Sequence, residues 1–233
     1  MKFILFALSS LLCWLMSSPA LAGEDSLYEF LWLDPDKKVY VLQNKLYKKE
    51  KTFYFDAGYM DNLTSKFQDT NGFGLRAGYY IHEEWGVEIF LNEYANKNND
   101  EYRNIRLINE TEPFIRRPKQ SYGAMVIWSP FYGKINTFNK IFYFDWSFGA
   151  GLGQIQTQTN LDTVVNSSAV SKFKTENNVA GVFKTKLRFH VSEHMNLGVE
   201  YMTQGYQAPG PRNPKQDNLR WNNDLIFSVG FSY

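Results

Sequence analysis

The segment Trp221-Asn-Asn-Asp-Leu-Ile-Phe-Ser-Val-Gly-Phe-Ser-Tyr233 decides the fold. Large apolar residues recur here at every second position, which is the pattern of a strand with one apolar face. The apolar face of this expected strand carries Trp221, Leu225, Phe227, Val229, Phe231 and Tyr233. The opposite face carries Asn222, Asp224, Ser228, Gly230 and Ser232. The segment therefore predicts a strand between an apolar and a polar environment.

Two further segments repeat the pattern. In 141–153 the apolar face carries Phe142, Phe144, Trp146, Phe148, Ala150 and Leu152, opposite Gly, Ser, Tyr and Asp. In 179–191 the apolar face carries Phe183, Leu187, Phe189 and Val191, opposite Lys184, Lys186, Arg188 and His190. A soluble sandwich also alternates, but its apolar face is buried and usually aliphatic. An aromatic face opposite glycine, serine and charge favours a barrel with lipid outside and a polar interior.

Eight segments of this kind are expected, and each is close to the roughly 9–11 residues that a tilted strand needs to cross a bilayer. They span about 52–60, 72–81, 85–94, 120–129, 141–153, 178–191, 195–202 and 221–233. The sequence thus predicts an all-β chain, an eight-stranded antiparallel up-and-down transmembrane β-barrel with an N-terminal periplasmic extension.

The connections between these segments alternate in length. The expected short or moderate ones are 82–84, 130–140 and 192–194, and the expected long polar loops are 61–71, 95–119, 154–177 and 203–220. Short turns of such barrels lie on the periplasmic side and long loops lie outside the cell. An even strand count then places both termini in the periplasm.

Composition excludes several other classes. The 233 residues include 25 Lys and Arg against 24 Asp and Glu, so there is no basic excess for a nucleic-acid surface. A single cysteine excludes a disulfide framework and a thiolate metal cluster. The aromatic content of 17% is the one unusual feature, and it suits the barrel.

The first 22 residues have the features of a secretory signal peptide. Lys2 supplies the positive start, an apolar run follows, and Ala20-Leu21-Ala22 is a small-x-small cleavage site. We expect cleavage after Ala22 and delivery to the outer membrane of a Gram-negative cell. Cys13 leaves a lipoprotein open, although Leu12 stands where a small residue is required. The expected parts are a signal peptide (1–22), an interfacial extension (23–51) and the barrel (52–233).

The extension is too apolar for a disordered tail. Its apolar stretch comprises Leu27, Tyr28, Phe30, Leu31, Trp32 and Leu33, and several lysines follow in 37–51. It can plug the periplasmic mouth, lie in the membrane interface, or pack on a second protomer. Interface or protomer packing is the favoured interpretation, so a homo-oligomer is a possible partner state, and the lysines suit anionic lipid headgroups.

The predicted inward positions carry both charges. The acids are Asp56, Glu88, Asp145, Glu200 and Asp224, and the bases are Arg76, Lys184, Lys186 and Arg188. Because unpaired charges in a narrow interior are costly, we expect a lumen plugged by ion pairs. A narrow porin-like or oligomeric channel is the alternative.

Signals for catalysis are weak. His190-Val-Ser192 matches a His-x-Ser spacing known from lipid A deacylation, but it falls at the periplasmic turn, whereas lipid A lies in the outer leaflet. A lipid-modifying enzyme therefore stays a minor alternative. The three histidines stand in separate segments without metal-ligand spacing, and no phosphate or dinucleotide motif is present. We expect no enzyme activity, cofactor or metal.

The C-terminal residues Phe227, Val229, Phe231 and Tyr233 are typical of the signal read by the outer-membrane insertion machinery. Ser228 stands where that signal usually has glycine, and a strand of a soluble sheet ending in tyrosine by chance is the alternative. The expected partners are therefore this machinery, outer-membrane lipid and lipopolysaccharide, with no nucleic acid.

The stretch Lys38-Val-Tyr-Val-Leu-Gln-Asn-Lys-Leu-Tyr-Lys-Lys49 resembles the lead-in of the outer-membrane β-barrel domain family of myxobacteria and Bdellovibrio-like predators. The hairpin Ile81-His-Glu-Glu-Trp-Gly-Val-Glu88 resembles the second hairpin of that family, although many barrels share its form. The resemblance covers about residues 38–233. It implies an outer-membrane barrel and carries no catalytic residues.

Overall fold

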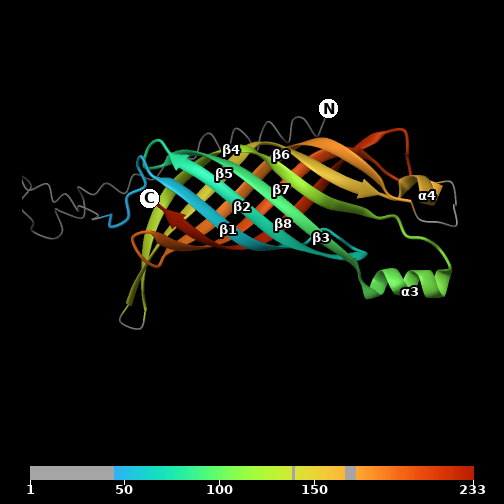
Figure 1. Ribbon diagram of the computed structural model, residues 1–233, viewed down its shortest axis with the longest axis horizontal. Helices are drawn as coiled ribbons and strands as arrows, with labels where there is room; N and C mark the ends of the chain where they lie inside the picture. Colours follow the sequence, from blue (N-terminus) through green and yellow to red (C-terminus); the bar gives the residue numbers. More distant parts are fainter. Residues whose placement is uncertain (1–44, 138–139, 166–171) are drawn as a thin grey trace, which may run out of the picture. The chain divides into compact units, whose positions relative to one another are not determined.

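Eight antiparallel strands close into one barrel in the computed structural model, which describes residues 45–137, 140–165 and 172–233. The strands are β1 (Phe53–Asn62), β2 (Gln68–Tyr80), β3 (Trp85–Asn98), β4 (Arg116–Thr137), β5 (Lys140–Thr159), β6 (Lys174–His190), β7 (Met195–Pro209) and β8 (Asp217–Ser232). Each strand pairs with the next along the chain (Figure 1). The prediction of an eight-stranded up-and-down barrel is confirmed.

Closure comes from the pairing of the first and last strands. Phe55 of β1 lies opposite Phe231 of β8, and the register continues to Asn62 opposite Asp224. No sheet edge is left along this stretch, so the backbone groups are paired within the barrel. A ring of eight strands is only wide enough inside for side chains, so their chemistry decides what the interior can do.

The barrel has two unlike ends. At the end named here the turn end, β2 and β3 are joined through residues 81–84, and β6 and β7 through 191–194. The strands β1 and β8 also begin and finish at this end. The opposite end, named the loop end, carries the connections 63–67, 99–115, 160–173 and 210–216. The expected alternation of turns and loops is present.

Several expected loop segments are strands instead. All eight strands continue at the loop end past the expected limits, so the sheet also includes 61–62, 68–71, 95–98, 116–119, 154–159, 174–177, 203–209 and 217–220. These extensions are held by polar cross-strand contacts, such as Gln156 to Asn177 at 3.1 Å and Thr203 to Asn223 at 2.7 Å. The contrast between apolar and polar faces fades there although the pairing continues, and for this reason the pattern missed them.

The prediction of a connection at 130–140 is also wrong, because most of this stretch is strand. Here β4 and β5 run on as a two-stranded ribbon to Thr137 and Lys140, with a register shift between Trp128 and Phe131. Pro130 falls in this bulge, where its missing N–H breaks no ladder hydrogen bond. Figure 1 shows the ribbon leaving the barrel sideways at the turn end.

Two short helices lie in the long loops. Helix α3 (Asp100–Asn109) begins after Asn99, whose side chain accepts a hydrogen bond from the Tyr102 N–H at 3.0 Å. It ends at Glu110, which adopts the left-handed conformation with φ 51°. Helix α4 (Leu161–Val165) follows β5. None of the helices among the described residues is both long and apolar enough to cross a membrane.

Candidate functional site

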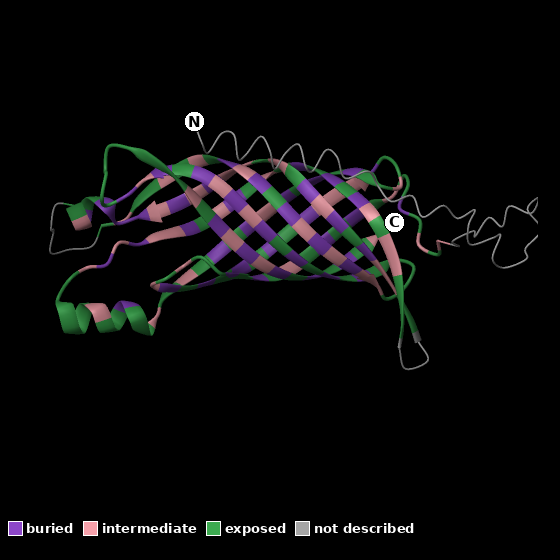
Figure 2. Cartoon of the chain, turned by 180° about the vertical axis from the view of Figure 1, so that it is seen from behind, coloured by how far each residue is buried: buried purple, intermediate pink, exposed green. Residues whose placement is uncertain are grey.

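The outer wall of the barrel exposes large apolar side chains on all eight strands. They include Phe53, Phe55, Tyr59, Phe73, Leu75, Trp85, Val87, Ile89, Tyr122, Val126, Trp128, Trp146, Leu152, Val179, Phe183, Leu197, Val199, Tyr201, Phe227, Val229 and Phe231. Figure 2 shows buried residues alternating with intermediate or exposed ones along the strands of the barrel wall. An apolar surface that runs around the whole barrel is far larger than the patches of soluble monomers, so the wall is built for lipid.

Aromatic rings gather on this wall near the turn end. The rings of Trp85 and Trp128 stack at 6.0 Å, and Trp146 lies 5.2 Å from Phe148. The Trp146 indole N–H also donates to the Thr185 hydroxyl at 2.7 Å. Rings with one polar edge are favoured where a membrane meets water, so this girdle marks one boundary of the apolar wall.

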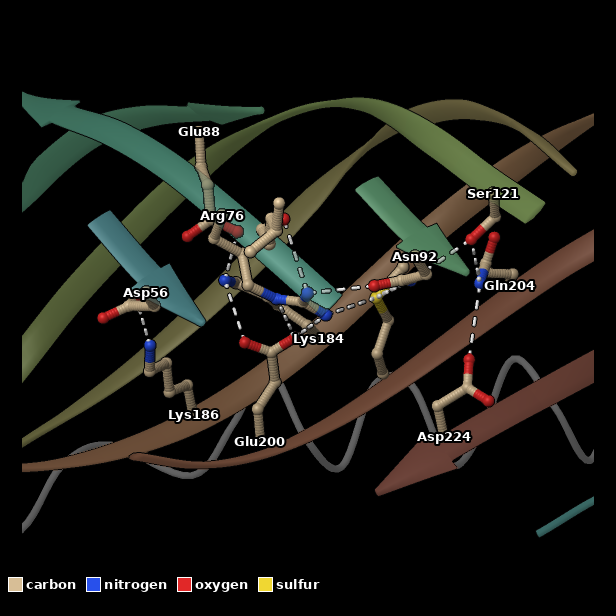
Figure 3. Close-up of polar contacts among 12 residues, drawn as sticks. Asp56, Arg76, Glu88, Asn92, Ser121, Lys184, Lys186, Glu200, Gln204 and Asp224 are labelled. Atoms are coloured by element: carbon tan, nitrogen blue, oxygen red, sulfur yellow. Dashed lines mark hydrogen bonds and ion pairs between the residues drawn. The ribbon is translucent and has the colours of Figure 1, made fainter. Parts of the chain in front are cut away.

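Inside the barrel, the centre of the lumen is a connected ion-pair cluster. The Arg76 guanidinium donates to the Glu200 carboxylate at 3.0 and 3.1 Å and to the Asn92 side-chain oxygen at 2.9 Å. The Lys184 ammonium lies between two carboxylates, those of Glu88 and Glu200. Figure 3 shows these side chains pointing from different strands toward one another. Each central carboxylate thus has a cation, which a buried charge requires.

A second cluster lies beside it, toward the turn end. The Lys186 ammonium is 2.5 Å from the Asp56 carboxylate, and the Arg188 guanidinium is 3.6 Å from the same oxygen. The Arg188 guanidinium also lies 4.5 Å from the centre of the Tyr54 ring, a cation–π distance. The hydroxyl of Tyr54 in turn donates to Glu88 at 2.6 Å, so the two clusters are joined.

The turn end is closed by residues before the first strand. The Lys49 ammonium reaches inward and donates to Asp145 at 2.8 Å and to Ser129 at 2.7 Å. The Nε2 atom of His190 lies 2.7 Å from the other oxygen of Asp145, and the ring of Tyr47 stacks on His190 at 4.5 Å. The segment 46–51, named here the turn-end plug, therefore lies at the mouth of the barrel and places the Lys49 side chain inside it.

Lys49 is a functional residue that the sequence pattern missed. It stands outside the alternating strands in a lysine-rich segment, where lysines are normally solvated, yet only 3% of it is exposed. Among the described residues, the buried Asp and Glu are Asp56, Glu88, Asp145, Glu200 and Asp224, and the buried Lys and Arg are Lys49, Arg76, Lys184, Lys186 and Arg188. Lys49 is thus the fifth base that balances the five acids.

Toward the loop end, the lumen is polar but mostly neutral. The Asp224 carboxylate accepts hydrogen bonds from the Tyr94 hydroxyl at 2.7 Å, from Asn62 at 2.7 Å and from Asn222 at 2.9 Å. It was expected within the ion-pair network, but the structure surrounds it with neutral donors. Gln204 and Ser121 extend this group (Figure 3). Such neutral partners carry no charge signal, so the sequence did not reveal them.

Small residues make room for these charges. A methyl group added at Gly74 would lie 2.1 Å from the Arg76 guanidinium, and one added at Gly230 would lie 1.9 Å from an Asp56 oxygen. Glycine at these positions therefore leaves the space that the charged ends of Arg76 and Asp56 occupy in the narrow barrel. All nine sequence-predicted lumen residues are buried inside the barrel, and eight of them form contacts with an oppositely charged side chain.

The other candidate residues fall into three groups. Ser192 accepts a hydrogen bond from the Met195 N–H inside its turn, while His190 faces Asp145, so each side chain has its own partner. At the C-terminus, Phe227, Val229 and Phe231 face outward, and Tyr233 pairs through its backbone with Phe53. The expected interface residues Leu27, Tyr28, Phe30, Leu31, Trp32 and Leu33, and the expected signal peptide, lie outside the described residues.

The polar side chains of the lumen bind one another and fill the interior of the barrel. Across the described ranges, no three His, Cys, Asp or Glu side chains come together in a way that could hold a metal ion. The lumen side chains instead hold one another at short distances from several strands, which is an arrangement suited to rigidity.

Comparisons place the chain beside known barrels. The chain matches no protein-family model and no curated protein sequence. Among solved structures it is similar to Ail, the attachment invasion locus protein of Yersinia pestis, at 11% identity over 79% of this chain and 99% of that chain, with a TM-score of 0.46. It is also similar to the N-terminal β-barrel domain of Pseudomonas aeruginosa OprF, at 9% identity over 79% and 98%, with a TM-score of 0.49.

A third similar structure is the outer membrane protein OprG of Pseudomonas aeruginosa, at 14% identity over 80% of this chain and 98% of that chain, with a TM-score of 0.46. These identities are too low to transfer a ligand or an activity. The class follows from the barrel itself, because a closed eight-stranded ring with an apolar outer wall and a polar, filled interior defines a small outer-membrane type β-barrel.

Proposed function

We propose that this chain is a non-conducting scaffold in the outer membrane that displays its four loop-end connections to the outside of the cell. The observation that carries the proposal is the filled lumen. Five buried acids and five buried bases lie within a ring too narrow for a water-filled channel. A transport protein would need an open path, whereas here the Arg76, Glu200 and Lys184 contacts cross the middle of the barrel.

The orientation follows from the two unlike ends. We propose that the turn end faces the periplasm and the loop end faces outward, because short turns and long loops are sorted this way in such barrels. The exposed apolar wall then contacts outer-membrane lipid and lipopolysaccharide. The last strand supports a role as the insertion signal, since Phe227, Val229 and Phe231 present an uninterrupted apolar face.

Two finer proposals remain predictions. Membership of the myxobacterial and Bdellovibrio-like barrel family rests on the stretch 38–49 and the hairpin 81–88. Side-by-side assembly into a homo-oligomer rests on the apolar stretch 27–33, with the apolar outer wall as a second contact surface. The His190–Ser192 pair gives an enzyme role no support, because Ser192 accepts a hydrogen bond within its own turn and His190 faces Asp145.

Conductance across a planar bilayer tests the scaffold against the channel. We expect the wild-type barrel to give no steady single-channel steps. The double variant Arg76→Ser and Glu200→Ser removes both members of the central pair together, so it leaves no unpaired charge from that pair and opens space in the middle of the lumen. This variant should give small uniform steps.

Two outcomes would count against the proposal. Uniform steps in the wild-type protein would favour the narrow channel. A silent double variant would mean that the central cluster is not what blocks the lumen. Folding of both proteins is checked first by the change in electrophoretic mobility on heating, so that a misfolded sample is not mistaken for a closed barrel.

A further inference from the structure

The rim of the barrel at the loop end is uneven. Strand β1 ends at Asn62, which lies opposite Asp224 of β8, whereas β8 itself begins at Asp217. The seven residues 217–223 extend roughly 23 Å beyond the end of β1, at about 3.3 Å per residue. The short β1–β2 connection therefore leaves a notch in the rim, with β7 and β8 standing above it on one side.

A cleft with a volume of about 410 Å³ lies in this notch. Three cationic side chains line it, those of Lys66, Arg116 and Arg220. Its aromatic lining residues are Phe67, Phe114, Tyr206 and Trp221. A neighbouring hollow of about 450 Å³ shares Phe114 and Arg220 and adds Arg212. Among the described residues, no Asp or Glu lines either hollow.

Two guanidinium groups converge at the wall of the cleft. Arg116 and Arg220 each donate through Nη2 to the carbonyl oxygen of Pro209, at 3.0 and 3.2 Å. Two cations that share one neutral acceptor repel each other, so an anion beside them would be stabilised. In the part of the chain that the structure describes, Arg116 forms an ion pair with Glu176, and Arg220 forms none.

The hydrogen bonds of the two arginines also leave positive charge at the cleft without a full set of partners. Arg220 donates to the carbonyl oxygens of Ala208 and Pro209 and lies 5.7 Å from the Phe114 ring. The Nε atom of Arg116 is buried and has no hydrogen-bond partner among the described residues, although 5% of that side chain is exposed. The donors of these two guanidinium groups are therefore only partly satisfied, and an anion in the cleft would offset part of their positive charge.

We propose that this cleft binds the carboxylate of an acidic saccharide. Arg220 and Lys66 supply charge-assisted hydrogen bonds to the carboxylate, and the buried Arg116 adds positive charge behind them. The aromatic rings supply flat apolar faces for the C–H face of a sugar ring, and the volume is at the small end of ligand pockets, about the size of one or two rings. This inference rests on the proposed function only for the side of the membrane that the cleft faces.

The source of such a saccharide is either the cell's own lipopolysaccharide or a free acidic glycan outside the cell. Both offer the same chemistry to the cleft. The binding measurement is made on the full folded chain in detergent, where sidedness has no influence. A failure of binding is therefore distinct from a failure of the proposed orientation, which protease access to the loops of intact cells would reveal.

The experiment is calorimetric titration with digalacturonate. Its dimethyl ester is the matched probe without charge, and we expect it to bind at least about tenfold more weakly. The variant Arg220→Gln should weaken digalacturonate binding by about tenfold or more. Lys66→Gln, in an exposed loop, should weaken it several-fold, and it serves as the second variant in case Arg220→Gln does not fold. Arg103→Gln, on exposed α3, is the control and should bind as the wild type does.

Each remaining outcome decides the question. Equal binding of the acid and its ester, or unchanged binding in both cleft variants, would overturn the proposal. Competition by inorganic phosphate as strong as that of digalacturonate would overturn the saccharide part, because the rings would contribute nothing. Competition by purified lipopolysaccharide would support the proposal and identify the membrane's own glycan, and its absence alongside digalacturonate binding would support an external one.

Discussion

Single residues decide whether the interior of this barrel is neutral. Of the ten buried charges in the described ranges, nine stand on strands at inward positions, and the tenth, Lys49, enters from the turn-end plug. Removing one member of a buried ion pair leaves the other charge unpaired in a medium of low polarity. The resulting loss of stability is larger than the net stabilisation that the pair provides. Lys49 therefore couples the segment before β1 to the stability of the barrel.

Replacing Lys49 with alanine tests this coupling. We expect Lys49→Ala to lower the free energy of unfolding by roughly 3 kcal/mol, because Asp145 loses its lysine partner and Ser129 loses its donor. The neighbouring Lys48 is exposed, so Lys48→Ala is a matched control with little expected effect. Urea unfolding in lipid vesicles measures both variants. Equal effects would show that Lys49 is not a buried partner.

At the scale of the elements, the two-stranded ribbon of β4 and β5 extends beyond the barrel wall. Strand β4 pairs with β3 only as far as Trp128, and β5 pairs with β6 only from Tyr143, so the ribbon beyond them pairs only with itself. One face of the ribbon continues the apolar wall, since Phe131 and Ile135 are both about half exposed. Exposing this apolar face to water is unfavourable, and the lipid around the barrel wall is next to it. Contact of this face with lipid is therefore the favourable arrangement.

The ribbon is expected to lie against the membrane by that face. A polarity-sensitive dye is attached to the variant Ile135→Cys. The variant Asn136→Cys, labelled on the opposite face, is the control. The expected cleavage after Ala22 would leave no native cysteine in the secreted chain. In vesicles the dye at position 135 should emit at shorter wavelength and be quenched by quenchers placed in the lipid. Identical spectra at the two positions would contradict membrane contact.

At the scale of the whole molecule, the open question is how many barrels associate. The apolar outer wall runs around all eight strands, so a second copy can pack on any side without exposing new polar groups. We predict that the stretch 27–33 supplies a further contact between copies. Light scattering of the protein in mild detergent, with the detergent mass subtracted, gives the number of chains in a particle.

We expect a particle of more than one chain, and deletion of 27–33 should reduce it to a single chain. A wild-type mass of one chain would contradict assembly through this stretch, and would leave the barrel as a lone scaffold. As a control, the charge-reversing change Lys48→Glu, within the plug but outside the apolar stretch, should leave the mass unchanged.

The sequence by itself determined the fold class and the inward residues. Both depend on a strict period of two, which local sequence displays wherever lipid lies on one side of a strand and the lumen on the other. The segment Trp221–Tyr233 shows this most clearly, and the nine predicted lumen charges all lie inside.

Only the tertiary structure decided which side chains are partners in the lumen and where the strands begin and end. Lys49 and the neutral donors around Asp224 are ordinary polar residues in sequence, and they become specific only because distant strands bring them within hydrogen-bond distance across the ring. The strand extensions and the ribbon were missed because backbone pairing continues where the environment no longer differs between the two faces. The cationic cleft arises from unequal strand lengths, a property of the closed barrel that no single segment contains.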